Sequence, residues 1–289
     1  MIKLTPKQES ARVFALKSLD SRNKEDFDAE FGALKKFKLH DHLVPVLAAF
    51  NHQNRYYLLF PWADGGNLMS YWKRNPKPVV AETILWVAEQ CHGLATALDH
   101  IHDVYSSPNI LGRDDMLEPE ASAKRFGRHG DIKPENVLQF PSNKHELGVL
   151  KLSDFGLTVF HGAKSKSRDR LDPSRRALTY NPPESVEDVN ISRRYDIWCL
   201  GCLYLEFVTW LLIGFEGIEA FSTKRWDERH SNQTIASDEY FRKEEGRKGP
   251  YGVLKKAVKN VGKVIFITCA EWQLTTLLAY IPVAISHKL

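Results

Sequence analysis

Cysteine is scarce in this sequence, with four residues among 289. A small disulfide-stabilised scaffold needs far more, so that class of protein is excluded. Cys199 and Cys202 form one C-x-x-C pair, but no second pair accompanies it, as the common four-ligand zinc sites require. Because the pair falls inside the apolar run 197–208, we predict two buried thiols on one helix rather than a zinc or redox site.

A strong excess of one charge is also missing. The sequence has 40 Lys and Arg residues against 36 Asp and Glu residues, a formal net charge of +4. A protein that coats nucleic acid is usually far more basic, so we expect no nucleic-acid partner. Hydrophobic residues at 43% and charged residues at 26% are ordinary for a globular protein, and the length suffices for one large or two small domains.

Neither end carries an apolar run typical of a targeting or membrane segment. The first residues lack the apolar core of a signal peptide, so we expect a cytoplasmic or nuclear location. Residues 264–285 are largely apolar, but Glu271 and Gln273 interrupt them, and the remaining stretch 274–285 is too short to span a bilayer. We therefore expect a packed or divergent C-terminal tail and no membrane partner.

The spacing of apolar residues divides the chain into two regions. The first, residues 1–61, predicts one helix at 26–37 and three strands at 12–19, 43–50 and 55–60. The second, residues 62–262, begins with a Gly-rich turn and is mainly helical, with helices at 83–101 and 194–213 and short strands at 137–140 and 149–152. The polar segment 103–128 is typical of an inserted loop, and 263–289 is a divergent apolar tail.

One set of short motifs carries the chemistry. In chain order they are Phe14-Ala15-Leu16-Lys17, Glu30, His129-Gly130-Asp131-Ile132-Lys133-Pro134-Glu135-Asn136, Asp154-Phe155-Gly156 and Pro182-Pro183-Glu184. This order resembles the signature set of the eukaryotic-type protein kinase domain. Each match alone is weak, but unrelated turns would not fall in this sequence. The resemblance implies a two-lobed α+β fold, with an incomplete, β-rich N-lobe at 1–61 and a larger helical C-lobe at 62–262.

The resemblance also implies a role for each motif residue in phosphoryl transfer from ATP with Mg²⁺. Asp131 would orient the substrate hydroxyl and accept its proton, and Lys133 would reach the transferred phosphate, as in serine/threonine kinases. Asn136 and Asp154 would supply the hard oxygen ligands that Mg²⁺ prefers. Lys17 would hold the ATP phosphates and pair with Glu30, while Tyr180 and Glu184 would close the activation segment.

The segment 60–68 extends the resemblance to the adenine site. Together with 86–91, 196–202 and 205–207 it resembles the kinase-like domains that are numerous in filamentous fungi, over roughly residues 12–262. That resemblance implies that Phe60 is the gatekeeper beside the adenine. The other residues that it assigns to ATP binding are Pro61, Trp62 and Ala63, through their backbone, and Asn67, near the ribose.

Three features depart from the family pattern. No glycine occurs in the 16 residues before Lys17, so we expect the first two strands and the loop that covers the phosphates to be missing, and ATP affinity to suffer. Gly130 replaces the Arg of the His-Arg-Asp motif, and a glycine cannot hold a phosphorylated activation segment. Beyond about residue 262 the sequence no longer follows the family.

We therefore predict an ATP-dependent serine/threonine protein kinase acting on protein substrates. The alternative is a catalytically impaired, kinase-like scaffold or a truncated product. The catalytic side chains favour the enzyme, and the missing glycine-rich loop and the tail favour the scaffold. The basic loop 161–176 suggests an acidic protein substrate.

Overall fold

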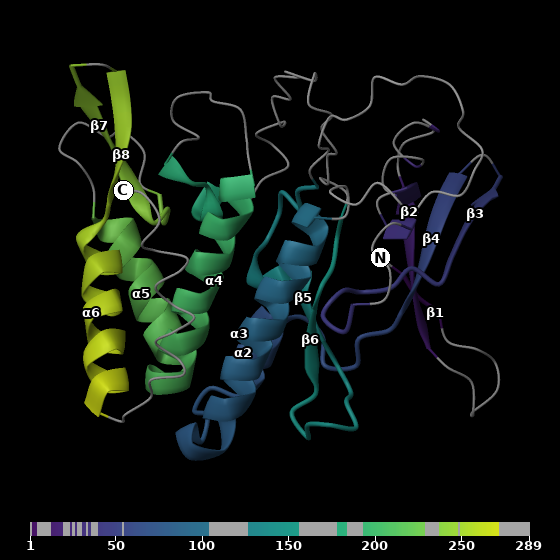
Figure 1. The fold of residues 1–289 in the computed structure, drawn as a ribbon, viewed down its shortest axis with the longest axis horizontal. Helices are drawn as coiled ribbons and strands as arrows, with labels where there is room; N and C mark the ends of the chain where they lie inside the picture. Colours follow the sequence, from purple (N-terminus) through teal and green to yellow (C-terminus); the bar gives the residue numbers. More distant parts are fainter. Residues whose placement is uncertain are drawn as a thin grey trace.

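The computed structural model describes residues 2–4, 13–19, 40–53, 55–103, 127–155, 178–183, 193–228, 237–247 and 249–271, and the single positions 24, 27, 31, 32, 34 and 35. Within these ranges a small sheet lobe and a larger helical lobe lie side by side (Figure 1). The predicted two-lobed α+β fold is therefore confirmed.

The small lobe is built on a four-stranded antiparallel sheet in the order β1-β2-β4-β3. Its strands are β1 (Ile2–Leu4), β2 (Phe14–Leu19), β3 (Ala48–His52) and β4 (Arg55–Pro61). Lys17 lies opposite Leu58 in the central β2–β4 pair, so backbone pairing fixes its place in the sheet. We expected the first two strands of the small lobe to be missing. This was wrong in part, because one short strand, β1, precedes β2 and pairs with it.

The strand predicted at 43–50 also begins later than expected. Leu43 and Val44 leave the sheet and pair with the large lobe instead, where the Val44 amide donates to the Leu152 carbonyl at 2.9 Å. The described positions of the helix predicted at 26–37 include Phe27, whose ring stacks on Tyr56 of β4 at 4.5 Å. This contact places that segment against the sheet.

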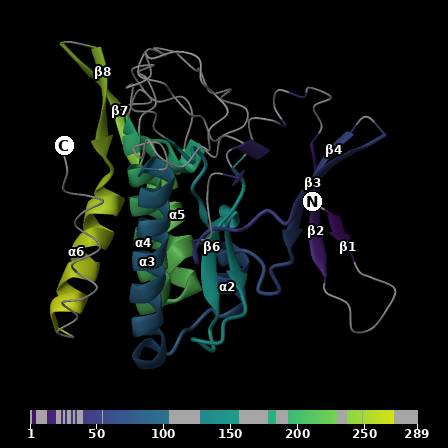
Figure 2. The same cartoon turned by 45° about the vertical axis from the view of Figure 1, so that its right-hand side comes forward.

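The large lobe consists of five helices and two hairpins among the described residues. The helices are α2 (Leu68–Arg74), α3 (Val80–Asp103), α4 (Arg193–Ile213), α5 (Phe215–Asp227) and α6 (Lys256–Glu271). The hairpins are β5 (Val137–Phe140) with β6 (Val149–Leu152), and β7 (Phe241–Gly246) with β8 (Gly249–Leu254). Both ribbon views place the β5–β6 hairpin on the side of α3 that faces the sheet lobe (Figures 1 and 2).

Helix α4 forms the centre of the large lobe, between α3 and α5 (Figure 1). By length and composition it could cross a membrane, but 78% of its most apolar window is buried inside the protein, as in a core helix. Cys199 and Cys202 lie buried on it, as the sequence predicted. Burial raises the pKa of both thiols well above the usual value, which keeps them protonated and unreactive.

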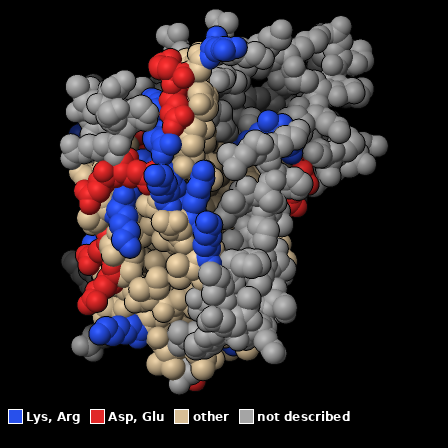
Figure 3. Space-filling model, turned by 90° about the vertical axis from the view of Figure 1, so that its left-hand side faces the viewer, with Lys and Arg blue, Asp and Glu red and all other residues tan. Residues whose placement is uncertain are grey.

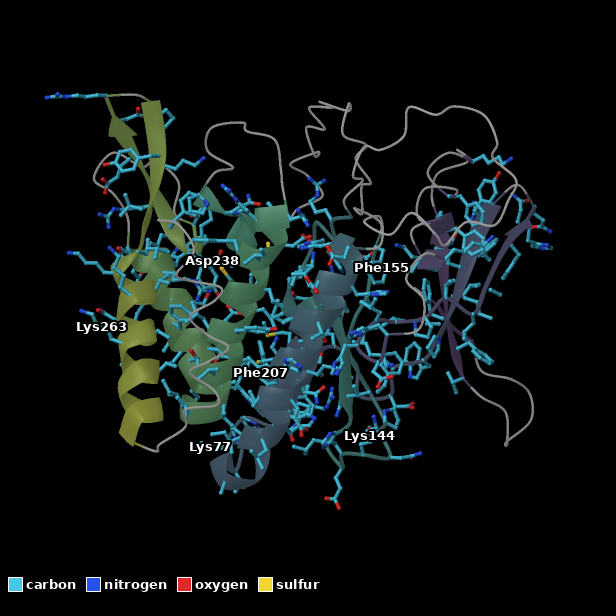
Figure 4. All side chains as sticks on the ribbon, viewed as in Figure 1. Lys77, Lys144, Phe155, Phe207, Asp238 and Lys263 are labelled. Carbon is cyan, nitrogen blue, oxygen red and sulfur yellow. The ribbon has the colours of Figure 1, made fainter. Side chains whose placement is uncertain are left out.

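Aromatic side chains fix the helices to one another and to the β5–β6 hairpin. Trp72 and Trp210 are fully buried, and both pack against Phe207 of α4 (Figure 4). The indole of Trp86 donates to the Gly148 carbonyl at 2.8 Å and thereby docks the hairpin on α3. Gly148 has a φ of 79°, a left-handed conformation that favours glycine in this turn.

The outer face of the large lobe is formed by the β7–β8 hairpin and α6. Glu228 caps α6 by accepting hydrogen bonds from the Lys256 and Ala257 amides at 2.6 and 2.9 Å. Exposed Lys256, Lys259 and Lys263 follow on α6, and acidic side chains lie beside the basic ones on this face (Figure 3). Helix α6 continues to Glu271, so the boundary predicted at 262 falls inside a helix.

Candidate active site

A cavity of about 380 Å³ lies between the two lobes. Among the described residues it is lined by Ala15, Lys17, Val44, Phe60, Pro61, Trp62, Ala63, Gly66, Leu138, Ser153, Asp154 and Phe155. Most of this surface is apolar, and the polar groups gather at one end, around Lys17 and Asp154. An apolar cleft with a few charged groups suits a ligand that has a flat ring system and a charged end.

The residues predicted to lie beside the adenine or the ribose of ATP line this cavity, with one exception. Phe60 on β4 and the following residues Pro61, Trp62 and Ala63 all face it. Asn67 is not among the described lining residues. Its side-chain oxygen instead accepts the Ser70 amide at 2.8 Å and caps the N-terminus of α2, a common role for Asn before a helix.

Lys17 and Asp154 meet at the polar end of the cavity. The Lys17 ammonium, on β2, lies 2.8 Å from a carboxylate oxygen of Asp154, and neither side chain is fully buried. Asp154 has a φ of 63°, which is uncommon for a residue with a side chain and marks a constrained position. Glu30, the predicted partner of Lys17, lies outside the described residues.

Asp131 is held by two side chains from the turn that follows it. The Lys133 ammonium lies 2.7 Å from one carboxylate oxygen of Asp131, and the Asn136 amide nitrogen lies 2.7 Å from the same oxygen. Asn136 also donates to the Asp131 carbonyl at 2.8 Å. The tight turn Pro134–Asn136 provides this geometry, since it brings Asn136 back toward Asp131. The predicted trio Asp131, Lys133 and Asn136 is thus brought together.

The backbone of this loop is fixed from below by a buried carboxylate. Asp196 on α4 is fully buried and accepts the His129 and Gly130 amides at 2.9 and 2.8 Å. His102, at the end of α3, makes a third contact with Asp196 at 2.9 Å. Gly130 has a φ of 84°, so this turn requires a left-handed residue where a side chain would be strained.

His129 acts as a brace rather than as a base. Its ring is fully buried, with Nε2 3.1 Å from the Ser153 carbonyl and Nδ1 accepting the Asp131 amide at 3.3 Å. Burial lowers the pKa of His129, which favours the neutral ring. The ring also packs against Phe155, with the centroids 5.1 Å apart, and Phe155 lies where the two lobes meet (Figure 4).

Asn136 and Asp154 offer oxygen atoms suited to Mg²⁺. The Ser153 amide donates to the Asn136 carbonyl at 2.9 Å. Because Ser153 directly precedes Asp154, this hydrogen bond ties the backbone beside Asp154 to Asn136. The Asn136 amide nitrogen faces Asp131, which leaves the amide oxygen for a cation. Two protein ligands are enough for Mg²⁺, which keeps several waters or phosphate oxygens. Within the described residues, no cluster of three or more His, Cys, Asp or Glu side chains could hold a metal.

Sequence reasoning missed several residues that shape the site. Ala15, Val44 and Leu138 supply apolar walls of the cavity. Alternation along strands could have indicated Ala15 on β2 and Leu138 on β5, but Val44 lies outside the strands. The contact of His102 with Asp196 was missed as well, because the two residues lie far apart in sequence.

Comparisons with known proteins agree with this site. The "Protein kinase domain" family matches residues 124–246, and the "Protein tyrosine and serine/threonine kinase" family matches residues 2–112. Aurora kinase B of Drosophila melanogaster is 29% identical over 64% of this chain and 45% of its own length. Aurora kinase A-B of Xenopus laevis is 29% identical over 71% of this chain and 43% of its own length.

A shorter match is closer in sequence. The serine/threonine-protein kinase chk-2 of Caenorhabditis elegans is 37% identical over 37% of this chain and 20% of its own length. The chain therefore spans less than half the length of these curated relatives. The resemblance to the kinase-like domains of filamentous fungi stays a prediction.

Proposed function

Since this chain belongs to the eukaryotic-type protein kinases, we propose that it transfers the γ-phosphoryl group of ATP to serine and threonine hydroxyls of proteins. One observation carries the proposal. Asp131, Lys133 and Asn136 converge within hydrogen-bond distance, beside a cavity that ends in Lys17 and Asp154. Unrelated loops have no reason to gather these five side chains.

Asp131 is the group that receives the proton. The substrate oxygen forms a bond to the γ-phosphorus, the bond to the β-phosphate oxygen breaks, and the hydroxyl proton passes to the Asp131 carboxylate while ADP leaves. Lys133 and Asn136 hold the carboxylate in position, and the Lys133 ammonium also faces the charge of the transferred phosphoryl group.

Lys17, Asn136 and Asp154 are assigned to the charged end of ATP. Mg²⁺, when bound, would neutralise phosphate charge. Asn136 and Asp154 would hold it through their oxygens, and Lys17 would turn from Asp154 toward the phosphates. Phe60 and the backbone of 61–63 would receive the adenine at the apolar end, where they line the cavity.

The substrate is proposed to be a protein serine or threonine. Lys133, two positions after Asp131, supports this class, and the relatives' names agree with it. The basic loop 161–176 supports an acidic substrate, though it lies outside the described residues. An intracellular location, without nucleic-acid or membrane partners, belongs to the same proposal.

Thermal unfolding of the whole chain with Mg²⁺ and ATP tests the nucleotide site. ATP at about 100 times its Kd should stabilise the folded chain by about 2.7 kcal/mol. The variant Asp154→Asn should lose this stabilisation. Transfer of radiolabel from ATP to casein, an acidic probe protein, then tests catalysis.

A kinase-like scaffold is the second candidate. The observation that favours it is the absence of glycine before Lys17, since a glycine-rich loop supplies backbone amides to the phosphates. A folded chain that shows no stabilisation by Mg²⁺ and ATP would support the scaffold and contradict the enzyme. Stabilisation without transfer to any probe protein would do the same.

A further inference from the structure

The short segment 178–183 is tied to the large lobe by side chains from several elements. Thr179 donates to an Asp238 carboxylate oxygen at 2.6 Å, and Tyr180 donates to a Glu206 carboxylate oxygen at 2.7 Å. Cys199 contacts the Tyr180 carbonyl at 3.2 Å. The segment's two adjacent hydroxyls are therefore both bonded to carboxylates, which are strong acceptors.

Glu206 and Arg225 form the buried centre of this arrangement. Arg225 on α5 lies 3.2 Å from Glu206 on α4, and both side chains are almost completely buried. Tyr240 donates to the same Glu206 oxygen at 2.7 Å, and its ring lies under the guanidinium at 4.2 Å. Burial, together with the Glu206 charge, raises the pKa of Tyr180, so the phenol keeps its proton and donates.

The contacts close into a ring. Arg225 donates through Nε to the Asp238 carbonyl at 2.9 Å, and the Asp238 carboxylate receives Thr179. Figure 4 shows Asp238 below the β7–β8 hairpin. Starting from Thr179, the path runs through Asp238, Arg225 and Glu206 to Tyr180, the next residue in the chain. Such a closed network favours one conformation of the segment, because no member can shift without breaking a hydrogen bond of the ring.

The anchored segment and the proposed catalytic loop are held by neighbouring residues of α4. Asp196 accepts the His129 and Gly130 amides at 2.9 and 2.8 Å, and Cys199, three residues later on the same helix, contacts the Tyr180 carbonyl at 3.2 Å. Because residues three apart share one face of a helix, the segment lies beside the backbone that carries Asp131.

We propose that Asp238 and Arg225 are positioning residues for the peptide substrate, which they serve by holding Thr179 and Tyr180. This inference rests on the proposed kinase function. Arg225 lies near the end of α5, and Asp238 lies shortly before the start of β7. Both are far from the catalytic motifs in sequence. They touch no reacting atom and act through the segment.

Steady-state kinetics on the whole chain test the proposal with Thr179→Val, which keeps the shape and removes the donor. The probe is a peptide mixture with a central serine or threonine. We expect the peptide KM to rise about tenfold, which corresponds to about 1.4 kcal/mol, with the KM for ATP changed less than twofold. Thr179→Ser keeps the hydroxyl and should restore the peptide KM. Asp238→Ala should match Thr179→Val.

Hydrogen exchange of the same variants gives a readout that does not require activity. The amides of residues 178–181 should exchange faster in Thr179→Val and Asp238→Ala, and at the original rate in Thr179→Ser. Unchanged exchange, an unchanged peptide KM, or failure of serine to rescue would overturn the positioning role. A native chain that binds Mg²⁺ and ATP but phosphorylates no peptide would contradict the proposed function instead, while the exchange rates still decide the anchoring.

Discussion

Lys17 and Asp154 form an ion pair of 2.8 Å across the polar end of the interlobe cavity. One comes from a strand of the small lobe and the other from the segment after β6 of the large lobe. Their contact therefore links the two lobes at the place where we assign the phosphates and Mg²⁺. Binding of Mg²⁺ and ATP would exchange this internal pair for two pairs with the ligand.

Replacement of Lys17 by methionine should weaken ATP binding. The change removes a charged donor that we assign to the phosphates, and such a hydrogen bond contributes about 1.5–3 kcal/mol. The Kd for ATP in the presence of Mg²⁺ should rise about 10- to 100-fold, measured by calorimetry. Lys144→Met is the control, because Lys144 is highly exposed and lies away from the cavity (Figure 4). Equal affinities in the two variants would contradict the assignment.

Replacement of Asp131 by asparagine should abolish the proton acceptor while ATP still binds. Loss of a general base lowers kcat by about 10²- to 10⁴-fold. The Kd for ATP should change little, because the carboxylate faces the hydroxyl side of the site. Radiolabel transfer measures the first effect and calorimetry the second. The exposed Asp41→Asn serves as the control and should keep full activity.

Replacement of Gly130 by alanine should destabilise the chain. Its φ of 84° costs a residue with a side chain about 1–2 kcal/mol, and the turn is buried. The free energy of unfolding in urea should fall by that amount. Gly262→Ala is a matched control with the opposite sign, because it adds a methyl group in open space inside α6 and should stabilise by about 0.5–1 kcal/mol. A neutral effect of Gly130→Ala would be incompatible with the left-handed turn.

Stability should fall in mildly acidic solution because of two partly buried histidines, His40 and His42. Burial lowers the pKa of His42 and His40 below the ordinary value of 6.5, with further lowering by neighbouring histidines and Lys151. Above pH 6.5 these rings are neutral in both states and their contribution to stability is complete. As the pH falls below 6.5, the unfolded chain binds protons first, so the free energy of unfolding decreases.

Chemical denaturation between pH 7.5 and pH 5 measures this effect. His42→Asn should reduce the slope of stability against pH, since it removes one of the lowered groups. An identical slope in this variant and in the unchanged chain would argue against a role of His42.

Much of the fold and site could be predicted because the motifs are local. The turn at Pro134–Asn136 brings Asn136 to Asp131 within a few residues, so spacing alone indicates their contact. For Asn67, the sequence did not reveal that its side chain caps α2, and its place near the ribose stays a prediction. An Asn before a helix has a local use that the family pattern did not reveal.

Long-range polar contacts could not be predicted in the same way. Glu206 falls within an apolar run, and this run predicts a buried helix. It does not indicate which positively charged residue pairs with Glu206. Arg225 supplies that cation from the next helix, and only the packing of α4 against α5 brings them together. The start of β3 was predicted too early for a related reason. The Val44 amide donates its hydrogen bond to the Leu152 carbonyl of the other lobe and not to a neighbouring strand.

The backbone bond between Val44 and Leu152 gives the molecule a second hinge point besides the chain at 61–67. His42 adds to it, since its carbonyl accepts the Leu152 amide at 2.8 Å. Two attachment points define an axis, so the lobes can twist about the line that joins them but cannot swing apart without breaking these bonds. The Lys17–Asp154 ion pair is a further contact between the lobes, so any motion that widens the cavity about this axis would have to separate these two side chains.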